Sequence, residues 1–241
     1  IVAGADGAGK GEVVRCLAEW LDPRGVDTHV FETPGEPRTG RAPFSHVWQA
    51  LPARGRVGVL FGSWHGAALL HRLAGGCDAG EYEELLGRIR RFEEMLVADG
   101  VVFLKLWLHL SKKELKRRIE DISKSRERHL RFLPVGWKHL KRHGDLLEAA
   151  DAMLRGTDSK EAPWHVLDAD DDRARNLAVA RLLLATLRKA GAGAPRKGAA
   201  RTEAKVAADR GQDPLRGWKP RPGGALAGVD ADDGEIIRAS M

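Results

Sequence analysis

The chain begins Ile1-Val-Ala-Gly4-Ala-Asp6-Gly7-Ala-Gly9-Lys10-Gly11, a short apolar run followed by a glycine-rich turn. Apolar residues then recur at helical spacing as far as Trp20, which predicts a helix directly after the glycines. A strand, a glycine-rich turn and a helix form the context of a phosphate-binding loop. The glycines let successive N–H groups face one anion, and the helix adds its positive end. We therefore expect phosphate to be bound by Gly4, Gly7, Gly9, Lys10 and Gly11.

Two side chains of this loop are candidate catalytic residues. Lys10 would supply a mobile positive charge that follows a transferring phosphoryl group. The loop departs from G-x-x-x-x-G-K-[ST] at Gly11, which stands where Ser or Thr would ligate magnesium. Asp6, inside the loop, is then the carboxylate expected to bind Mg²⁺. The alternative is a glycine-rich turn that binds nothing.

The rest of the chain alternates between short apolar runs and helical patterns. This alternation predicts a parallel sheet with helices on both faces, an α/β class fold. A capping-box pattern, Ser111 with Glu114, predicts a helix start. Strands are expected at Ile1–Ala3, Thr28–Phe31, Arg56–Phe61, Val101–Leu108 and Trp164–Leu167, and helices at Glu12–Trp20, Ser45–Leu51, Gly80–Leu96, Lys113–Ile119, about 135–153 and Arg173–Lys189.

The composition changes near residue 190. The stretch 191–229 is rich in Ala, Gly, Pro, Arg and Lys and has few large apolar residues. Such a stretch buries too little surface to offset its conformational entropy. We expect one folded domain over 1–190, and a disordered tail or linker over 191–241 that led to a second domain. The start at Ile1, within an apolar run and without methionine, favours a fragment whose first strand is cut.

A basic segment runs from Lys112 to Arg142, with twelve Lys or Arg and four acidic residues. Charge of this density repels itself unless an anion is bound. In P-loop kinases a mobile lid occupies the corresponding position and closes over the donor phosphates. We therefore expect a helical lid at about 112–145, with Arg126 and Arg128 among its phosphate-binding residues. The alternative is a solvated helical face.

Bulk properties narrow the class of protein. The formal net charge of +6 favours an anionic partner. Cys16 and Cys77 are the only cysteines, too few for a disulfide framework or a cysteine metal site. No apolar run approaches the roughly 20 residues of a membrane span, so we expect a cytoplasmic protein without a membrane partner.

Several motifs in a fixed order resemble the polyphosphate kinase 2 family, and most closely the first of two tandem domains in polyphosphate:AMP phosphotransferases. The resemblance covers nearly all of 1–190. The motifs are Gly4–Gly11, Leu51-Pro52-x-x-Gly55-Arg-Val57, Phe61-Gly-Ser63-Trp64, Ser111-Lys112, and Ala162-Pro163-Trp164 with Asp168-Ala-Asp170.

The resemblance implies a three-layer α/β/α P-loop kinase fold and transfer of a phosphoryl group from inorganic polyphosphate to a nucleotide, AMP giving ADP. It implies Mg²⁺ as cofactor, a basic channel for polyphosphate and a homo-oligomer, with no nucleic acid as partner. Asp6 and Lys10 match the family's loop acid and lysine. Arg117 and Arg118 fall where the basic residues of the family's lid begin, so the resemblance makes them catalytic candidates.

The chain departs from the family's second-strand motif, which falls here at the end of the strand expected over Arg56–Phe61. The family motif reads Phe-Asp-Arg-Ser-Trp-Tyr, but here Phe61 stands for the Asp, Gly62 for the Arg and His65 for the Tyr. A phenyl ring cannot ligate Mg²⁺ and glycine cannot grip phosphate. Loss of such metal-binding and phosphate-binding side chains lowers transition-state stabilisation by roughly several kcal/mol.

Three hypotheses remain open. The first is an active polyphosphate-dependent nucleotide kinase, which the intact loop favours. The second is a catalytically degenerate structural or polyphosphate-binding domain that supports an active second domain, which Phe61 and Gly62 favour. The third, an ATP-dependent nucleoside monophosphate kinase, would need an adenine-stacking pocket that the sequence does not show.

Overall fold

Five parallel strands form the sheet of the computed structural model, which describes residues 1–31, 45–124 and 142–192. Their order is β2 (Val26–Val30), β3 (Val57–Phe61), β1 (Val2–Gly4), β4 (Lys105–His109) and β5 (Trp164–Asp168). The shortest strand, β1, lies at the centre, where Val2 is in register with Phe61 on one side and Leu106 on the other. The carboxyl end of β1 therefore opens between two neighbouring strands, where parallel sheets bind ligands.

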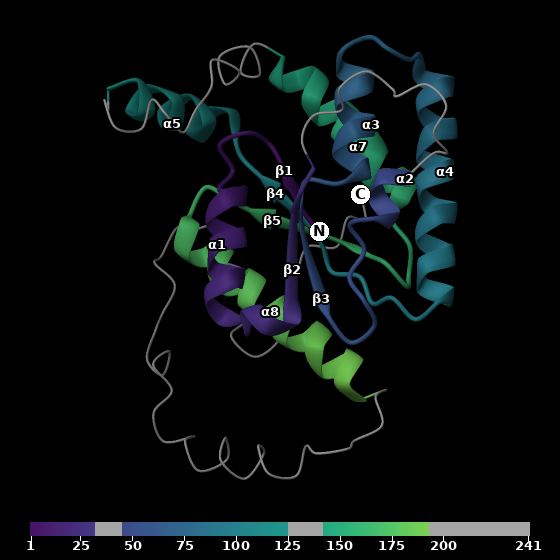
Figure 1. Ribbon diagram of the computed structural model, residues 1–241. Coiled ribbons are helices and arrows are strands. Elements are labelled where there is room, and N and C mark those ends of the chain that lie inside the picture. Colours follow the sequence, from purple (N-terminus) through teal and green to yellow (C-terminus); the bar gives the residue numbers. More distant parts are fainter. Residues whose placement is uncertain (32–44, 125–141, 193–241) are drawn as a thin grey trace.

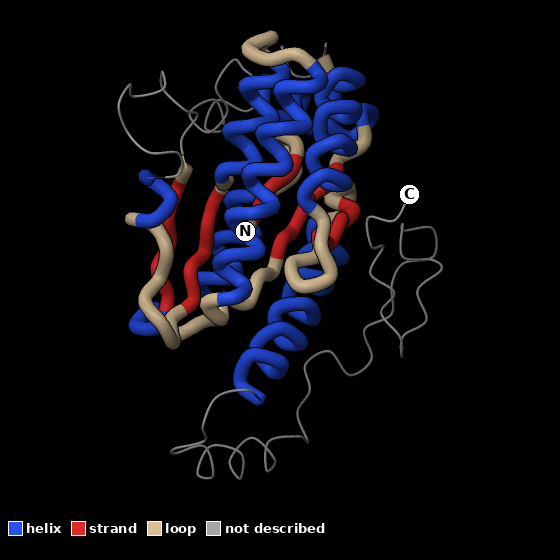
Figure 2. Tube along the Cα trace, turned by 90° about the vertical axis from the view of Figure 1, so that its right-hand side faces the viewer, coloured by secondary structure: helices blue, strands red, loops and turns tan. Residues whose placement is uncertain are grey.

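Helices cover both faces of this sheet (Figures 1 and 2). One layer holds α1 (Lys10–Trp20), which contacts β1 and β3, and α8 (Asp172–Ala192), which contacts β5. The other layer holds α3 (Trp64–Leu73), α4 (Ala79–Ala98) and α7 (His143–Thr157), which pack on one another. Two further helices are α2 (Ser45–Trp48) and α5 (Lys112–Lys124), and a 3₁₀ turn spans Pro23–Gly25. The expected three-layer α/β/α fold with a parallel sheet is confirmed.

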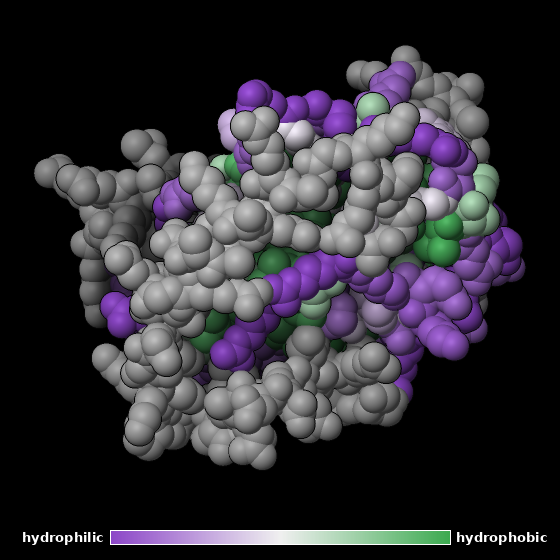
Figure 3. Space-filling model, turned by 90° about the horizontal axis from the view of Figure 1, so that it is seen from below, coloured by the Kyte–Doolittle hydropathy of each residue, from purple (hydrophilic) through white to green (hydrophobic). Residues whose placement is uncertain are grey.

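Apolar side chains from both helix layers meet the sheet in one hydrophobic core. Ile89 of α4, Met153 of α7, Leu108 of β4 and Val179 of α8 are fully buried in it. On the face seen in Figure 3, hydrophilic side chains make up much of the coloured surface, and hydrophobic ones show mainly in the recesses. None of the helices in the described ranges is long and apolar enough to cross a membrane.

The expected start of one strand differs from the structure. A strand was expected over Val101–Leu108, but β4 begins only at Lys105. The neighbouring strands explain this start, because Lys105 pairs with Trp164 at the beginning of β5 and Leu106 pairs with Val2 at the beginning of β1. Residues 101–104 precede both partners and make no ladder.

The predicted capping box before α5 is half confirmed. The amide of Glu114 donates to Ser111 Oγ at 3.2 Å, as expected of an N-cap. The prediction of a reciprocal bond from the Ser111 amide to the Glu114 carboxylate is wrong, because this amide donates instead to Asp170 Oδ1 at 3.0 Å. The Glu114 carboxylate is engaged by two arginines of its own helix, which ties it away from the cap.

Other expectations fall outside the described residues. These are residues 125–141 of the expected lid, which include Arg126 and Arg128, and residues 193–241 of the expected tail or linker. The tail or linker and the rest of the lid therefore stay predictions.

A buried ion pair interrupts the apolar core behind the sheet. Lys105 Nζ lies 2.7 Å from Glu93 Oε2 and 2.7 Å from the carbonyl oxygen of Thr157, and the Lys105 side chain is fully buried. Its ammonium also lies 5.0 Å from the ring centroid of Trp164. Burial raises the pKa of Glu93, but the bonds to His65 and Lys105 outweigh it and hold that pKa below its usual value. Burial lowers the pKa of Lys105, and the bond to Glu93 opposes that effect, so their contact favours the charged form of both side chains.

Replacing Lys105 by methionine is expected to lower the free energy of unfolding by about 3–5 kcal/mol. The methionine fills similar volume, so the loss reports mainly the Glu93 carboxylate left in the core without its cation. Urea denaturation followed by circular dichroism measures it. Arg90→Ala is the control, because it removes an exposed pair with Glu94 on the same helix and should change stability by no more than about 0.5 kcal/mol. Equal losses in the two variants would show that burial of the pair is not what matters.

Candidate functional site

The glycine-rich turn joins the carboxyl end of β1 to the start of α1. Gly4, at φ +143°, lies so close to the backbone of Leu108 on β4 that a Cβ would overlap it. Gly9, at φ +83°, is the left-handed N-cap of α1, and its Cβ would meet the guanidinium of Arg175. Both positions therefore require glycine, and together they curl the turn over the end of the sheet.

Several amides of the turn are available to a ligand. Within the described ranges, the N–H groups of Gly7, Gly9, Lys10 and Gly11 donate to no protein acceptor. The first amide of the helical ladder, that of Val13, donates to the Gly9 carbonyl at 3.0 Å. Unpaired amides at a helix N-terminus, with the helix dipole behind them, form an anion-binding site. This arrangement agrees with the phosphate-binding loop that the sequence predicts.

Lys10 and Asp6 lie together at the mouth of the turn. Lys10 Nζ donates to the carbonyl oxygens of Gly4 at 2.8 Å and Ala5 at 3.0 Å, and lies 3.3 Å from Asp6 Oδ1. Burial lowers the pKa of Lys10, and the neighbouring Asp6 carboxylate partly offsets that effect. The structure therefore places these two predicted catalytic residues in contact, with the lysine folded back on its own loop.

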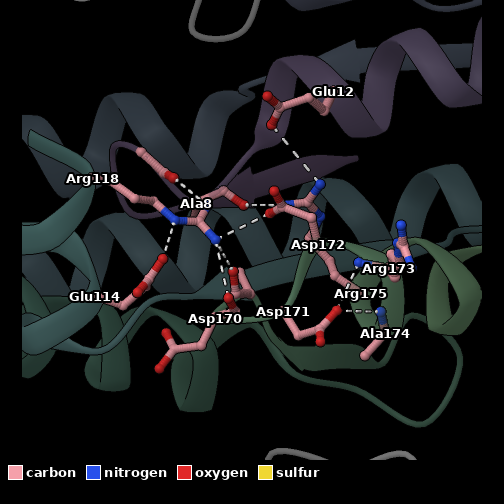
Figure 4. A network of polar contacts seen from close by, with 12 residues as sticks. Ala8, Glu12, Glu114, Arg118, Asp170, Asp171, Asp172, Arg173, Ala174 and Arg175 are labelled. Atoms are coloured by element: carbon pink, nitrogen blue, oxygen red, sulfur yellow. Dashed lines mark hydrogen bonds and ion pairs between the residues drawn. The ribbon is translucent and has the colours of Figure 1, made fainter. Parts of the chain in front are cut away.

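Arg118 joins α5 to the turn, and Figure 4 shows its guanidinium beside Glu114, Asp170 and Asp172. Its Nη1 donates to the carbonyl of Gly7 at 2.9 Å, and its Nη2 donates to the carbonyl of Ala169 at 2.8 Å. The structure therefore brings Arg118 to the loop, where its bonds hold backbone carbonyls, and its catalytic role stays a prediction.

Arg175 of α8 supports the next residue of the turn, and sequence reasoning missed it. Its Nη1 donates to the carbonyl of Ala8 at 3.1 Å and to Asp172 Oδ1 at 2.7 Å. The same Asp172 oxygen accepts from Arg118 at 3.0 Å, so one carboxylate fixes both arginines (Figure 4). The available signal was an acid and an arginine three residues apart in the first turn of the last helix.

Arg117, the other predicted lid residue, is not brought to the turn. Its guanidinium pairs with Glu114 on one side and with Asp121, at 2.8 Å, on the other, and its side chain is 60% exposed. The hydrogen bonds from Arg117 and then Arg118 outweigh partial burial and lower the pKa of Glu114 to about 2. The described part of the basic segment thus neutralises much of its own charge, and the catalytic role of Arg117 stays a prediction.

The adjacent arginines of α5 make a matched test. Arg118→Ala is expected to lower the free energy of unfolding by about 2–4 kcal/mol, because it leaves buried carbonyls unpaired. It should also weaken tripolyphosphate binding about tenfold, since the turn loses the bond to its Gly7 carbonyl. Arg117→Ala should change neither quantity measurably. Thermal denaturation and titration calorimetry at fixed salt measure both, and similar effects of the two substitutions would contradict this role of Arg118.

A pocket of about 420 Å³ opens beside Asp6 and Lys10. Its wall on α3 is made of small and apolar residues, and α7 adds further apolar side chains. Arg142 borders it and donates to the carbonyl of Leu73 at 2.6 Å. The lining residues from α3 and α7 are Gly66, Ala67, Leu69, Leu70, Leu73, Leu146 and Met153.

Phe61 and Gly62, where the chain departs from the family motif, both line this pocket. A Cβ on Gly11 would lie 4.0 Å from the Phe61 ring, so the two positions expected to supply metal-ligating oxygens face each other without one. Gly62 has φ +73°, and a Cβ there would lie 3.2 Å from the carbonyl oxygen of Phe31. An arginine at that position would therefore strain the backbone.

The donor set allows magnesium only with help from a substrate. Within the described ranges, no three His, Cys, Asp or Glu side chains cluster as a metal site. Asp6 is the carboxylate that lines the pocket, and its side chain is 36% exposed. Mg²⁺ in phosphate sites commonly uses one or two carboxylates, with substrate phosphates and water completing its shell. Asp6 fits that minimal role.

Comparison with known proteins agrees with the geometry. Residues 1–194 match the family described as Polyphosphate kinase 2. A polyphosphate:AMP phosphotransferase of Pseudomonas aeruginosa is 35% identical over 79% of the chain, and a GDP-polyphosphate phosphotransferase of the same species is 31% identical over 76% of it. The crystal structure of a polyphosphate kinase 2 from Arthrobacter aurescens superposes with a TM-score of 0.74 at 29% identity, covering 85% of this chain and 73% of that one.

The chain is shorter than these curated relatives. The matched region spans 38% of the polyphosphate:AMP phosphotransferase and 52% of the GDP-polyphosphate phosphotransferase.

Proposed function

Because the chain belongs to the polyphosphate kinase 2 family, we propose that it transfers a phosphoryl group from inorganic polyphosphate to a nucleotide, converting AMP to ADP. The observation that carries the proposal is a set of loop amides without backbone acceptors among the described residues, next to Lys10, which itself lines an apolar-walled pocket. One part of this site suits a phosphate chain and the other suits a nucleoside.

The donor phosphates would lie on the loop. The amides of Gly7, Gly9, Lys10 and Gly11 would bind the terminal phosphoryl group, and Lys10 Nζ would exchange its carbonyl partners for phosphate oxygens. Asp6, released from Lys10, would hold Mg²⁺ together with those oxygens, and the metal would neutralise charge on the transferring group. Arg118 and Arg175 would keep the loop carbonyls turned away from the phosphate.

The acceptor needs no general base. The attacking atom is a phosphate oxygen of AMP, which is already ionised near neutral pH. Its bond to the terminal phosphorus of polyphosphate forms as the phosphoanhydride bond to the next phosphate breaks. The shortened polyphosphate leaves with the electron pair and negative charge, so catalysis consists of positioning and charge neutralisation.

The apolar part of the pocket would take the nucleoside. Its volume of about 420 Å³ falls within the range of small-molecule sites. Phe31, Phe61 and Trp107 are the aromatic residues on its wall, and the small residues of α3 leave room for a planar base. Since the curated relatives are named for AMP and for GDP, the shape alone does not favour one base.

A second candidate function is supported by Phe61. With a ring in place of the family's Asp, Mg²⁺ would have one carboxylate from the described residues, and transfer would be slow or absent. The domain would then bind polyphosphate and support a catalytic domain elsewhere in a longer protein. The loop and its arginines would serve binding in either case.

A direct assay separates these functions. The purified chain is incubated with Mg²⁺, polyphosphate and AMP, and ADP is followed by chromatography, with ATP replacing polyphosphate in a parallel reaction. ADP formed from polyphosphate supports the kinase. Salt-sensitive binding of polyphosphate without ADP supports the binding domain, and ADP formed only with ATP rejects both.

A further inference from the structure

Ser63 is the N-cap of α3, yet its side chain caps nothing. Its hydroxyl accepts no hydrogen bond from the first turn of the helix, which is what an N-cap serine ordinarily does. Its Oγ lies instead 3.0 Å from His65 Nδ1, and the residue is only 3% exposed. Ser63 also borders the pocket beside the phosphate loop. The hydroxyl is therefore held in an unusual role at a ligand site.

The surroundings of the other ring nitrogen of His65, Nε2, determine whether Ser63 or His65 donates the hydrogen bond between them. His65 is fully buried, and its Nε2 lies 3.0 Å from Glu93 Oε1. Burial lowers the pKa of His65, so the ring is neutral and carries one hydrogen. Glu93 is ionised because it also bonds Lys105. The hydrogen-bond geometry between Nε2 and Glu93 Oε1 is poor, but a lone pair on Nε2 would face the carboxylate oxygen at this distance and be repelled, so the hydrogen lies on Nε2 and Nδ1 carries a lone pair.

It follows that Ser63 donates its hydroxyl hydrogen to His65. With that hydrogen committed, the oxygen can offer only its lone pairs to a ligand in the pocket that Ser63 borders. A phosphate oxygen has no hydrogen to offer, so this atom disfavours phosphate and favours a ligand group that carries O–H or N–H. The buried chain Lys105–Glu93–His65 thereby sets the hydrogen-bonding character of one point on the pocket wall.

We infer that Ser63 is a specificity-determining residue whose oxygen accepts a hydrogen bond from a ribose hydroxyl of the acceptor nucleotide. The inference rests on the proposed function. The preceding residue, Gly62, donates its amide to Val2 at 3.1 Å, so Ser63 lies beside the strand that runs into the phosphate loop. In a nucleoside monophosphate the sugar is attached directly to the phosphate, so a nucleotide whose phosphate reaches the loop would bring its ribose towards Ser63.

Affinity measurements test the contact. Dissociation constants of AMP, 2′-deoxy-AMP and 3′-deoxy-AMP are measured by calorimetry with the full chain, its Ser63→Ala variant and a Ser159→Ala control. We expect Ser63→Ala to weaken AMP about two- to tenfold, as for one hydrogen bond. Loss of the hydroxyl concerned should weaken binding to the same extent in the parent chain and have no further effect in Ser63→Ala. Equal weakening of all three ligands by Ser63→Ala, or no weakening, overturns the inference.

A second measurement tests the direction of the bond without a nucleotide. Nitrogen-15 NMR of the imidazoles, with His65 assigned by its loss in His65→Gln, should show hydrogen on Nε2. Hydrogen on Nδ1 would make Ser63 the acceptor and overturn the inference. The proposed function fails separately: if ADP is not formed from polyphosphate while AMP binds with the expected coupling, Ser63 keeps this role and the transfer reaction is rejected. If AMP does not bind at all, both are rejected.

Discussion

Replacing Lys10 by alanine is expected to lower the rate of ADP formation from polyphosphate and AMP by about 10²–10³-fold. Lys10 is the only cation that the described loop itself carries, and in the proposed function its ammonium would leave the carbonyls of Gly4 and Ala5 to bind the terminal phosphoryl group. Its bonds are to carbonyls and a carboxylate of its own turn, so its loss should leave the fold intact. The measurement is kcat at saturating AMP and polyphosphate, with the melting temperature recorded alongside.

Lys116→Ala is the control for this substitution. Lys116 lies on α5, is 63% exposed and has Glu120 as a distant partner at 3.9 Å. The Lys116→Ala substitution removes the same charge without touching the loop. Its kcat should stay within about twofold of the parent value, because exposed charges are screened by salt. A loss of less than tenfold in Lys10→Ala, or an equal loss in the control, would contradict the role given to Lys10.

Replacing Phe61 by aspartate is expected to raise the Mg²⁺-dependent rate about 100-fold, equivalent to about 2.7 kcal/mol of barrier. The new carboxylate would lie at the pocket wall beside Gly11, the position that also lacks a metal-ligating hydroxyl. With Asp6 it would give the metal two carboxylates. The gain should appear in a magnesium titration as a lower half-saturating concentration as well as a higher kcat.

The Phe61→Leu variant distinguishes the effect of the new carboxylate from the effect of losing the aromatic ring. Both variants remove aromatic packing, but only aspartate can bind the metal. Gly62 is kept in both, because a side chain at φ +73° costs about 1–2 kcal/mol. If Phe61→Asp and Phe61→Leu have the same rate and the same magnesium dependence, the missing carboxylate is not what limits this chain.

Local patterns were sufficient to predict most of the fold. Most strands contain a short apolar run, the longer helices show apolar residues at helical spacing, and the alternation of the two admits few arrangements. Boundaries were less certain where pairing depends on distant partners. Residues 101–104 are as apolar as the strand that follows them, but only the positions of β1 and β5 decide where β4 begins.

The candidate site could also be predicted where its residues are close in sequence, but not where they are distant. Asp6, Lys10 and the glycines are contiguous in sequence, so their chemistry could be predicted from spacing alone. Arg175 supports Ala8 from 167 positions away, and nothing local indicates such a contact. A lysine within the apolar run of β4 was a signal for a buried charge. Its partner Glu93, however, could be identified only once α4 was packed behind the sheet.

The account as a whole depends on phosphate being held by the amides of the first turn. The most direct measurement is a titration of the nitrogen-15-labelled chain with tripolyphosphate, following the backbone amide resonances. We predict that Gly7, Gly9, Lys10 and Gly11 shift together, that raising the salt concentration weakens the effect, and that Lys10→Ala strongly reduces it. Saturable binding that leaves these four amides unchanged would contradict the account.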